Sequence, residues 1–537
     1  MYDSLGPLFV DLFEAQLMGE DCVSIFSHVR HNLDSSGVGL TDGGEALPDD
    51  FRYQTAGLST SFAPGAREAV IAHHHNITGN NLEAVNAIVA AAKAFGESGA
   101  RSDLRALYTT LIRDEMVTVI DEVLAALNDL PDETLSGILR AGIAFFYGAP
   151  DRGPVKFGIS VIGHSNATDL LNDLKLIARH EEFSIYAAVA VEKLLDQPQS
   201  AVFDMARSVT GWGRIELVYR LAGWDNEIFS DWLVRGGFHN TVLDEYLAFT
   251  AATNGKLLLA LRNGVHTDDL LESASEIITA LIRGGPVQDM TEYDDGAAVV
   301  ELYLEALTER QISIRQFVSL FEIQDFLSDI DIDWDTRMTY GWTPRRCESI
   351  NEKVTTLIHR ANLSSRVQSA LLSSDKHIFE AALEAADLLD LEVWDIVFAR
   401  VSKEPSRAVC WFDAARHMSL DTVDQMVSLA RSHMDVKALG TGAAMETGVG
   451  TEFGPHDALM FLVRELSRFP KKGWDLVEVA LKSPIIPCRW TAVSTIDMWA
   501  HVSWTEEMAS AINLAFTLEV SDDLRDYMEQ VIQLRTN

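Results

Sequence analysis

Apolar residues recur at the helical period along most of this chain, and this pattern constrains the fold more than any other feature of the sequence. Between Asp169 and His180 the apolar side chains fall at positions i, i+1, i+4, i+7 and i+8, and the segment from Phe183 to Leu195 repeats the stripe. Such spacing places them on one face of an α-helix. We predict two helices joined by a short exposed turn at 180–182, forming a helical hairpin.

Similar stripes follow through the rest of the chain. The clearest runs from Leu270 to Ile282, with Thr267 as the expected N-cap and Gly284 after its end. Another stripe comprises Ile378, Ala381, Ala382, Ala385, Leu388 and Leu389. Near the carboxy terminus, Ser503 and Glu506 have the spacing of a capping box. Because neither helix of a hairpin can bury its stripe alone, we expect the hairpins to stack on one another.

Two pairs of segments carry a resemblance to a known class of proteins. One is Asp169-Leu-Leu-Asn-Asp-Leu-Lys-Leu-Ile-Ala-Arg-His180 with Phe183-Ser-Ile-Tyr-Ala-Ala-Val-Ala-Val-Glu-Lys-Leu-Leu195, and the other lies at 474–481 and 489–499. Both pairs resemble the HEAT and armadillo-like helical repeats. The resemblance implies alternating outer and inner helices along a superhelix, with the inner helices lining a groove that binds macromolecules. We predict an all-α fold, an irregular α-solenoid of stacked helical hairpins.

Breaks in the helical pattern suggest the domain organisation. They lie at 32–65, 147–154, 329–346 and 440–455, and they are rich in Gly, Pro or acidic residues. We predict an N-terminal helical segment at 1–150 with a long polar loop at 32–65, helical repeats at 151–328, an acidic connector at 329–346, and further helical repeats at 347–537 with a Gly-rich loop at 440–455.

The charge of the chain narrows the choice of partners. The 537 residues include 43 Lys and Arg against 80 Asp and Glu, a formal net charge of −37. Such a surface repels phosphate groups, so we expect no nucleic-acid binding and no adhesion to anionic membranes. Two interpretations remain open: the charge serves solubility, or it provides an acidic face for a basic protein partner.

The cysteines and the hydropathy pattern indicate a cytoplasmic protein. The four cysteines show no CxxC spacing and are expected to be reduced. The first seventeen residues have no basic stretch before their apolar ones, and no window approaches eighteen uninterrupted apolar residues. We therefore expect neither a secretory signal nor a transmembrane helix.

Histidines supply one set of candidate metal ligands or bases. His28 and His31 lie one helical turn apart, and His73, His74 and His75 follow one another. Consecutive helical residues point in different directions, so the triplet cannot converge on one ion. We predict no metal site and no cofactor here. The alternative is a helical enzyme or metal-binding protein, with a pocket between the N-terminal segment and the repeats that uses these histidines.

Carboxylates supply the other candidates. Asp329, Asp331, Asp333 and Asp335 would share one face of an extended strand, but the glycine and glutamate of a calcium loop are replaced by Trp334 and Tyr340. We expect an acidic connector whose Ile and Trp residues pack on a neighbouring repeat. Glu181 and Glu182 could act as acid and base, but on an exposed turn we expect them to be solvated. We find no nucleophile or phosphate-binding motif, and we expect no catalytic residues.

Tryptophans supply the candidate binding residues. Trp212, Trp224 and Trp232, with Arg235 nearby, could form an anchor cluster on the groove, since Trp and Arg dominate binding energies at interfaces. The alternative is that they fill gaps between hairpins. We adopt the first hypothesis: a non-catalytic interaction scaffold that binds a macromolecular partner along its groove.

Overall fold

The fold is entirely α-helical. A computed structural model describes residues 23–36, 38–41, 43–50, 63–74, 81–113, 116–263, 266–329, 334–446, 448, 453–499 and 504–536. These residues form 30 α-helices and no β-strand, and 71% of the structure is helix. The predicted all-α fold class is confirmed. Within the described residues no helix combines the length and the apolar character needed to cross a membrane.

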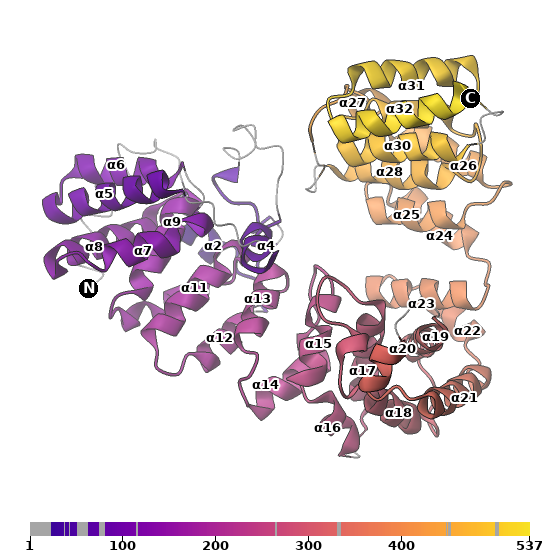
Figure 1. Ribbon diagram of the computed structural model, residues 1–537, viewed down its shortest axis with the longest axis horizontal. Helices are drawn as coiled ribbons and strands as arrows, with labels where there is room; N and C mark the ends of the chain where they lie inside the picture. Colours follow the sequence, from indigo (N-terminus) through magenta and orange to yellow (C-terminus); the bar gives the residue numbers. More distant parts are fainter. Residues whose placement is uncertain are drawn as a thin grey trace. The chain divides into compact units, whose positions relative to one another are not determined.

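The chain divides into two compact units, 1–52 with 64–362 and 53–63 with 363–537 (Figure 1). The helices of the first unit are α2 (Ile25–His31), α4 (Ala66–His74), α5 (Leu82–Ser98), α6 (Arg101–Leu111), α7 (Ile120–Leu127), α8 (Asp132–Gly148), α9 (Arg152–Gly163), α10 (Leu171–Ile177), α11 (Glu181–Leu194), α12 (Gln199–Ala206), α13 (Trp212–Arg220), α14 (Glu227–Trp232), α15 (Glu245–Thr253), α16 (Leu257–Arg262), α17 (Asp268–Arg283), α18 (Gly296–Leu307), α19 (Ile314–Ser328), α20 (Trp334–Thr339) and α21 (Pro344–Arg360).

The helices of the second unit are α22 (Ser364–Ala370), α23 (Lys376–Leu388), α24 (Trp394–Lys403), α25 (Ala408–His417), α26 (Val423–His433), α27 (Val436–Leu439), α28 (Gly454–Leu466), α29 (Trp474–Leu481), α30 (Ile486–Met498), α31 (Glu506–Leu518) and α32 (Asp522–Thr536). The division after residue 362 coincides with none of the four predicted breaks. At the predicted break near residue 150, α8 and α9 pack closely against each other within one unit.

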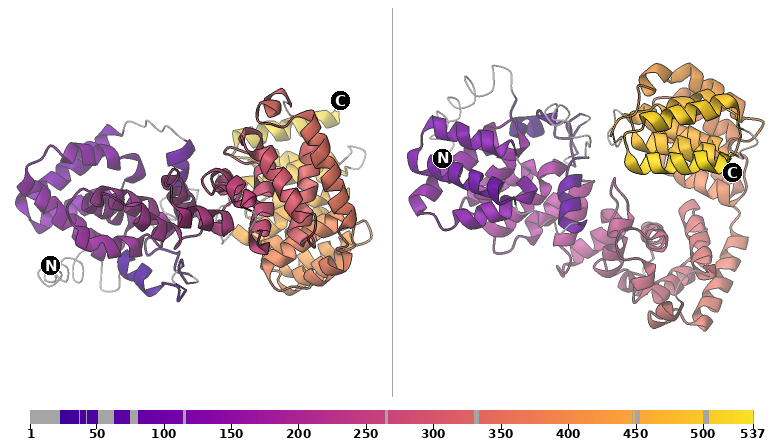
Figure 2. Two further views of the ribbon diagram at one scale, coloured as in Figure 1. Left: turned by 90° about the horizontal axis from the view of Figure 1, so that it is seen from below. Right: turned by 45° about the horizontal axis from the view of Figure 1, so that its top comes forward.

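Helices two apart in the sequence pack side by side, so that the hairpins stack in two layers. In the first unit α9, α11, α13, α15, α17, α19 and α21 form one continuous layer, while α10 packs on α12 and α16 on α18. In the second unit α25, α28, α30 and α32 form one layer, and α27, α29 and α31 form the other (Figures 1 and 2). Each hairpin thus covers the apolar stripe of the next.

Two arginines in equivalent positions show that part of the chain repeats. Arg360 donates hydrogen bonds to the carbonyl groups of Leu307, Thr308 and Arg310, which lie 53, 52 and 50 residues before it, at the end of α18. Arg468 donates to the carbonyls of Ala415, Arg416 and Met418, at the same three separations, at the end of α25. Each arginine satisfies carbonyls that a helix end leaves without intrahelical partners.

The same offset relates the cores of two helices. Arg468 follows Arg360 by 108 positions, and this shift also carries α17 onto α23. The buried residues Leu271, Ala274, Ile277 and Ile278 of α17 correspond to Phe379, Ala382, Ala385 and Ala386 of α23, which are buried as well. The core positions of α17 and the arginine contact at the end of α18 therefore recur in the second unit at the same offset.

The predicted helix after Thr267 is confirmed as α17, and its stripe from Leu270 to Leu281 is buried. Thr267 occupies the N-cap position, but its side chain makes no capping hydrogen bond to the backbone. In α23 the predicted stripe is confirmed at Ala382 and Ala385, which are buried, but it is wrong by one position at its ends, because Ile378 and Leu388 are 48% and 37% exposed. The larger Phe379 takes the core position and turns Ile378 outward.

The predicted cap of the helix near residue 506 is also wrong. The N-cap of α31 is Thr505, whose side chain accepts a hydrogen bond from the backbone N–H of Met508 at 3.2 Å. Ser503 lies outside the described residues. Thr505, like serine, carries a hydroxyl group that can accept the capping hydrogen bond. The sequence therefore predicted a hydroxyl N-cap correctly but placed it two residues too early.

Candidate interaction surface

Two of the three tryptophans that the sequence suggests as binding residues, Trp224 and Trp232, lie in one aromatic cluster. The ring of Phe203, from α12, lies 5.9 Å from Trp224 and 5.1 Å from Trp232, and Phe229 lies 5.8 Å and 6.2 Å from the same two rings. Both phenylalanines are buried, whereas both tryptophans are half-buried. We call these four residues the tryptophan cluster. The two tryptophan rings are therefore partly exposed at the surface and pack on the two buried phenylalanines.

The two tryptophans differ in how tightly the fold holds them. A Cβ atom on Gly237 would lie 2.6 Å from the Trp232 ring, so Trp232 packs directly against the backbone. Trp224 lies in the loop between α13 and α14, and its ring contacts those of Phe203 and Phe229. Arg214 stacks over Trp232, with 5.8 Å between its guanidinium carbon and the ring centroid. The fold therefore contacts Trp232 on more sides than Trp224.

The third tryptophan belongs to a different site. Trp212, on α13, lies 5.2 Å from the ring of Tyr246, on α15. Tyr246 helps to form a pocket of about 390 Å³ that is lined by Tyr219, Tyr246, Phe249, Thr250, Pro286, Val287 and Gln288. We call it the aromatic pocket. The structure thus separates Trp212 from the tryptophan cluster but places it beside an aromatic-lined cavity.

Arg235 belongs to neither aromatic site. Its Nε atom donates to Asp231 at 2.7 Å, and its Nη1 atom donates to Asp269 and, at 3.2 Å, to the Thr267 hydroxyl. These contacts hold the guanidinium against the start of α17. The predicted grouping of Arg235 with the three tryptophans is therefore not present in the structure.

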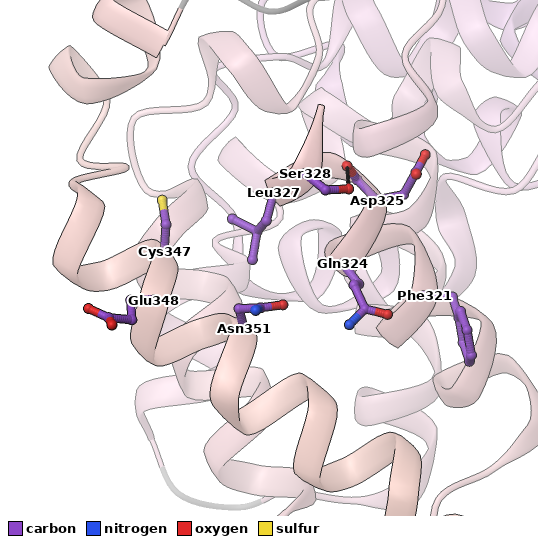
Figure 3. A pocket seen from close by; sticks show the side chains of 8 residues that line it. All are labelled: Phe321, Gln324, Asp325, Leu327, Ser328, Cys347, Glu348 and Asn351. Atoms are coloured by element: carbon purple, nitrogen blue, oxygen red, sulfur yellow. Dashed lines mark hydrogen bonds between the residues drawn. The ribbon is translucent and has the colours of Figure 1, made fainter. Parts of the chain in front are cut away.

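A second, larger pocket lies between α19 and α21 (Figure 3). Its volume is about 650 Å³, and it is lined by Phe321, Gln324, Asp325, Leu327, Ser328, Cys347, Glu348 and Asn351. In Figure 3 the Asn351 side chain reaches from α21 toward α19, whereas Glu348 points away. Burial raises the pKa of the Cys347 thiol, which is the opposite of what an activated nucleophile requires. The pocket offers amide and carboxylate groups suited to hydrogen bonding.

Salt bridges between neighbouring helices occupy most of the cations on this part of the chain. Residues 212–362 contain 25 Asp and Glu but 13 Lys and Arg. Eight of these cations form salt bridges: Arg220–Glu192, Arg235–Asp269, Lys256–Asp225, Arg283–Glu322, Arg310–Asp268, Arg315–Glu276, Arg346–Glu301 and Lys353–Glu305. Because carboxylates outnumber cations, the electrostatic potential around residues 212–362 is negative.

Of the histidine candidates, only the side chains of His28 and His31 lie in the described part of the chain. The His28 ring hydrogen-bonds to the Gly44 carbonyl at 3.0 Å, and the His31 ring bonds to the Ser27 carbonyl at 2.6 Å. The backbone of His73 and His74 ends α4, but their side chains, and all of His75, lie outside the described part. Among the described residues there is no group of three or more His, Cys, Asp or Glu side chains that could hold a metal ion.

The alternating aspartates are not all on an extended strand. Asp331 and Asp333 lie outside the described residues, whereas Asp335 lies in the first turn of α20. The indole N–H of Trp334 donates to the Asp329 carbonyl at 3.0 Å, and the Arg337 guanidinium stacks over the Trp334 ring. Asp335 is therefore helical and does not continue an extended face of carboxylates.

The prediction that 180–182 is an exposed, solvated turn is wrong. His180 is the buried N-cap of α11, Glu181 begins the helix, and Glu182 is buried. The Glu181 carboxylate accepts from the backbone N–H groups of Thr210 and Gly211 at 2.9 and 2.7 Å. It thereby holds the loop before α13 against the start of α11.

Glu182 belongs to a group of buried charges that sequence reasoning missed. Lys156, on α9, is 5% exposed, and its ammonium group contacts the carboxylates of Glu182, at 2.5 Å, and Glu68. Arg152, one turn earlier, donates to Asp49 at 3.0 Å and to Glu182 at 3.4 Å. We call these five residues the buried charge cluster. It lies at the contact between the described part of the N-terminal segment and the repeats.

The charges of this cluster stabilise one another. Burial raises the pKa of Glu182, but Lys156 and Arg152 outweigh burial and lower it to about 2. Burial lowers the pKa of Lys156, but Glu182 and Glu68 outweigh it and hold the pKa well above its ordinary value. The ammonium and the Glu182 carboxylate are therefore both charged at neutral pH, and the cluster joins α4 and residues 43–50 to α9 and α11.

Comparison with known proteins gives no family for this chain. No protein-family model and no curated protein matches it.

Proposed function

We propose that this chain is a non-catalytic scaffold that binds a basic protein partner along the layer from α13 to α21. The observation that carries the proposal is the charge balance of residues 212–362, where 25 carboxylates exceed 13 cations and eight of those cations are held in salt bridges. A basic partner would be attracted by this field, and nucleic acids would be repelled.

Aromatic sites on this layer and next to it support the proposal. Trp224 and Trp232 are half-buried and pack on buried phenylalanines, so their side chains would lose little conformational entropy on binding. Tryptophans in such surroundings are common hot spots of protein interfaces. The aromatic pocket involves α13 and α15, and the pocket of about 650 Å³ lies between α19 and α21. The tryptophan cluster comes from α12, α14 and the loop before α14, and Arg214 of α13 stacks over its Trp232 ring. We also propose a cytoplasmic location, since the described cysteines Cys347, Cys410 and Cys488 are free thiols.

The test uses the full-length chain to capture partners from the source cell at low salt. Trp224→Ala is expected to weaken binding of the captured basic protein by at least about tenfold with an unchanged melting curve, because Trp224 lies in a loop at the rim of the cluster. Trp232→Ala is expected to lower the melting temperature first, because its ring packs on Gly237.

The matched control is Trp490→Ala in the second unit, where Trp490 is 41% exposed and stacks on Tyr527. This variant should bind the partner as the unaltered chain does. The proposal is wrong if Trp224→Ala and Trp490→Ala bind equally well, or if the captured molecule is a nucleic acid.

A further inference from the structure

The aromatic pocket has the size and the lining of a site for one side chain of the partner. Its volume of about 390 Å³ lies in the range of ~300–1,000 Å³ typical of ligand sites. Tyr246 forms a mostly buried wall, while Tyr219 and Phe249 are half-buried. The Tyr219 hydroxyl donates to the Tyr246 carbonyl at 2.5 Å, which fixes the position of its ring. Aromatic faces carry partial negative charge and attract cations.

Carboxylates stand close to these rings. Trp212, Glu216 and Tyr219 are spaced i, i+4 and i+7, which places them on one face of α13. Burial raises the pKa of Tyr219 to about 12, and the negative charge of Glu216 adds to this effect. The fold therefore holds a buried carboxylate next to an aromatic wall of the pocket.

A second acidic residue, Glu245, lies next to the pocket lining. Glu245 precedes Tyr246 on α15 and is half-buried. A Cβ atom on Gly285 would lie 2.9 Å from the Glu245 Cβ, so Glu245 packs against the segment that continues into Pro286 and Val287 of the pocket wall. Negative charge thus flanks the rings on both helices.

The cations nearest in sequence are already engaged elsewhere. Arg220 pairs with Glu192 at 2.8 Å, and Arg283 pairs with Glu322 at 2.7 Å. The seven lining residues include no Lys, Arg or His. The pocket therefore combines aromatic faces and nearby carboxylates with no cation of its own in the lining.

We propose that the aromatic pocket binds an arginine side chain of the basic partner, with the guanidinium stacked on Tyr219 and Phe249 and facing the carboxylate of Glu245. This inference rests on the proposed scaffold function and names the group that the scaffold recognises. A guanidinium suits the site because it is planar, weakly hydrated and able to stack on a ring while donating to a carboxylate. A neutral side chain of the same shape would lack both attractions.

The test measures binding of the full-length chain to a fluorescein-labelled nine-residue peptide of alternating Gly and Arg. Phe249→Ala and Glu245→Gln are each expected to weaken binding at least about tenfold, and the same peptide with citrulline for arginine should bind at least about tenfold more weakly. Citrulline keeps the shape of arginine without its charge. A melting curve accompanies each variant, and the half-buried Glu245→Gln variant tests the site with little change in packing.

The matched controls are Phe398→Ala, a half-buried aromatic of the second unit that stacks on Trp394, and Glu309→Gln, an exposed carboxylate outside the pocket. Both should bind the peptide as the unaltered chain does. Equal binding by the unaltered chain, Phe249→Ala and Glu245→Gln would overturn the pocket assignment and leave the scaffold proposal standing. Failure of the unaltered chain to bind the peptide would overturn both.

Discussion

Replacing Lys156 by methionine is expected to lower the free energy of unfolding of the first unit by roughly 3–5 kcal/mol, the cost of breaking a buried ion pair from one side. The ammonium group contacts both Glu182 and Glu68, and all three side chains are buried. Methionine has a volume similar to that of lysine, so the loss of unfolding free energy comes mainly from the missing charge and less from changed packing. Urea unfolding followed by circular dichroism gives the value.

The matched control is Lys175→Met, which removes a surface salt bridge to Asp204 at 2.6 Å. Partly exposed pairs contribute about 0–1 kcal/mol, so this variant should lose little. Adding Glu68→Gln and Glu182→Gln to Lys156→Met should recover part of the loss, because the uncompensated carboxylates are then gone. Equal losses in Lys156→Met and Lys175→Met would show that the cluster is not a buried ionic contact.

Lowering the pH from 7 to 5 is expected to cost the first unit about 2 kcal/mol through His180 alone. Burial lowers the pKa of His180 to about 4, below the ordinary value of 6.5. A group whose pKa is lower in the folded state contributes stability above its unfolded pKa and loses it as the pH falls toward the folded value. The loss from His180 therefore falls between pH 6.5 and 4.

The geometry around His180 requires a neutral ring. Its Nε2 atom donates to the Glu45 carbonyl at 3.1 Å, and its Nδ1 atom accepts from the backbone N–H of Glu182 at 3.2 Å. Protonation of Nδ1 would remove the acceptor that caps α11. His180→Gln keeps one donor and one acceptor, so its stability should fall less steeply over this pH range. Identical slopes in His180→Gln and the unaltered chain would contradict this assignment.

The helices could be predicted because their signal is local. The stripes of α10, α11 and α17 follow from spacing within one helix, and so does the pairing of α10 with α11 in a hairpin. The one-position error in α23 also has a local cause, since Ile378 and Phe379 are both apolar and spacing alone does not decide which one faces inward.

The buried charges could not be predicted because their partners are distant in the sequence. Glu68 lies 88 residues from Lys156, and Asp49 lies 103 residues from Arg152. In the sequence, His180, Glu181 and Glu182 read as a polar turn, and only the approach of α9 and the N-terminal segment makes them core residues. A basic pair spaced i, i+4 in the apolar α9, Arg152 and Lys156, was the one available signal.

For the candidate binding residues, whose role stays a prediction, the sequence indicated the residue types but not the grouping. Residue type singled out Trp212, Trp224 and Trp232, and the structure places all three in half-buried aromatic surroundings. The three tryptophans are close in sequence but do not form one group in the structure. Trp212, on α13, faces α15, whereas Trp232, on α14, faces α12. The aromatic pocket went unnoticed because Tyr219, Tyr246 and Pro286 come from three separate segments.

The association rate of the full-length chain with the Gly–Arg peptide, measured by stopped-flow fluorescence over a range of salt, tests the central claim most directly. We expect the rate to fall at least about tenfold between about 20 mM and 300 mM salt, as the Debye length shortens from roughly 20 Å to below 10 Å. A labelled single-stranded DNA of similar length should not bind at any of these salt concentrations. A peptide association rate that does not change with salt, or tight binding of the DNA, would contradict an acidic scaffold for basic protein partners.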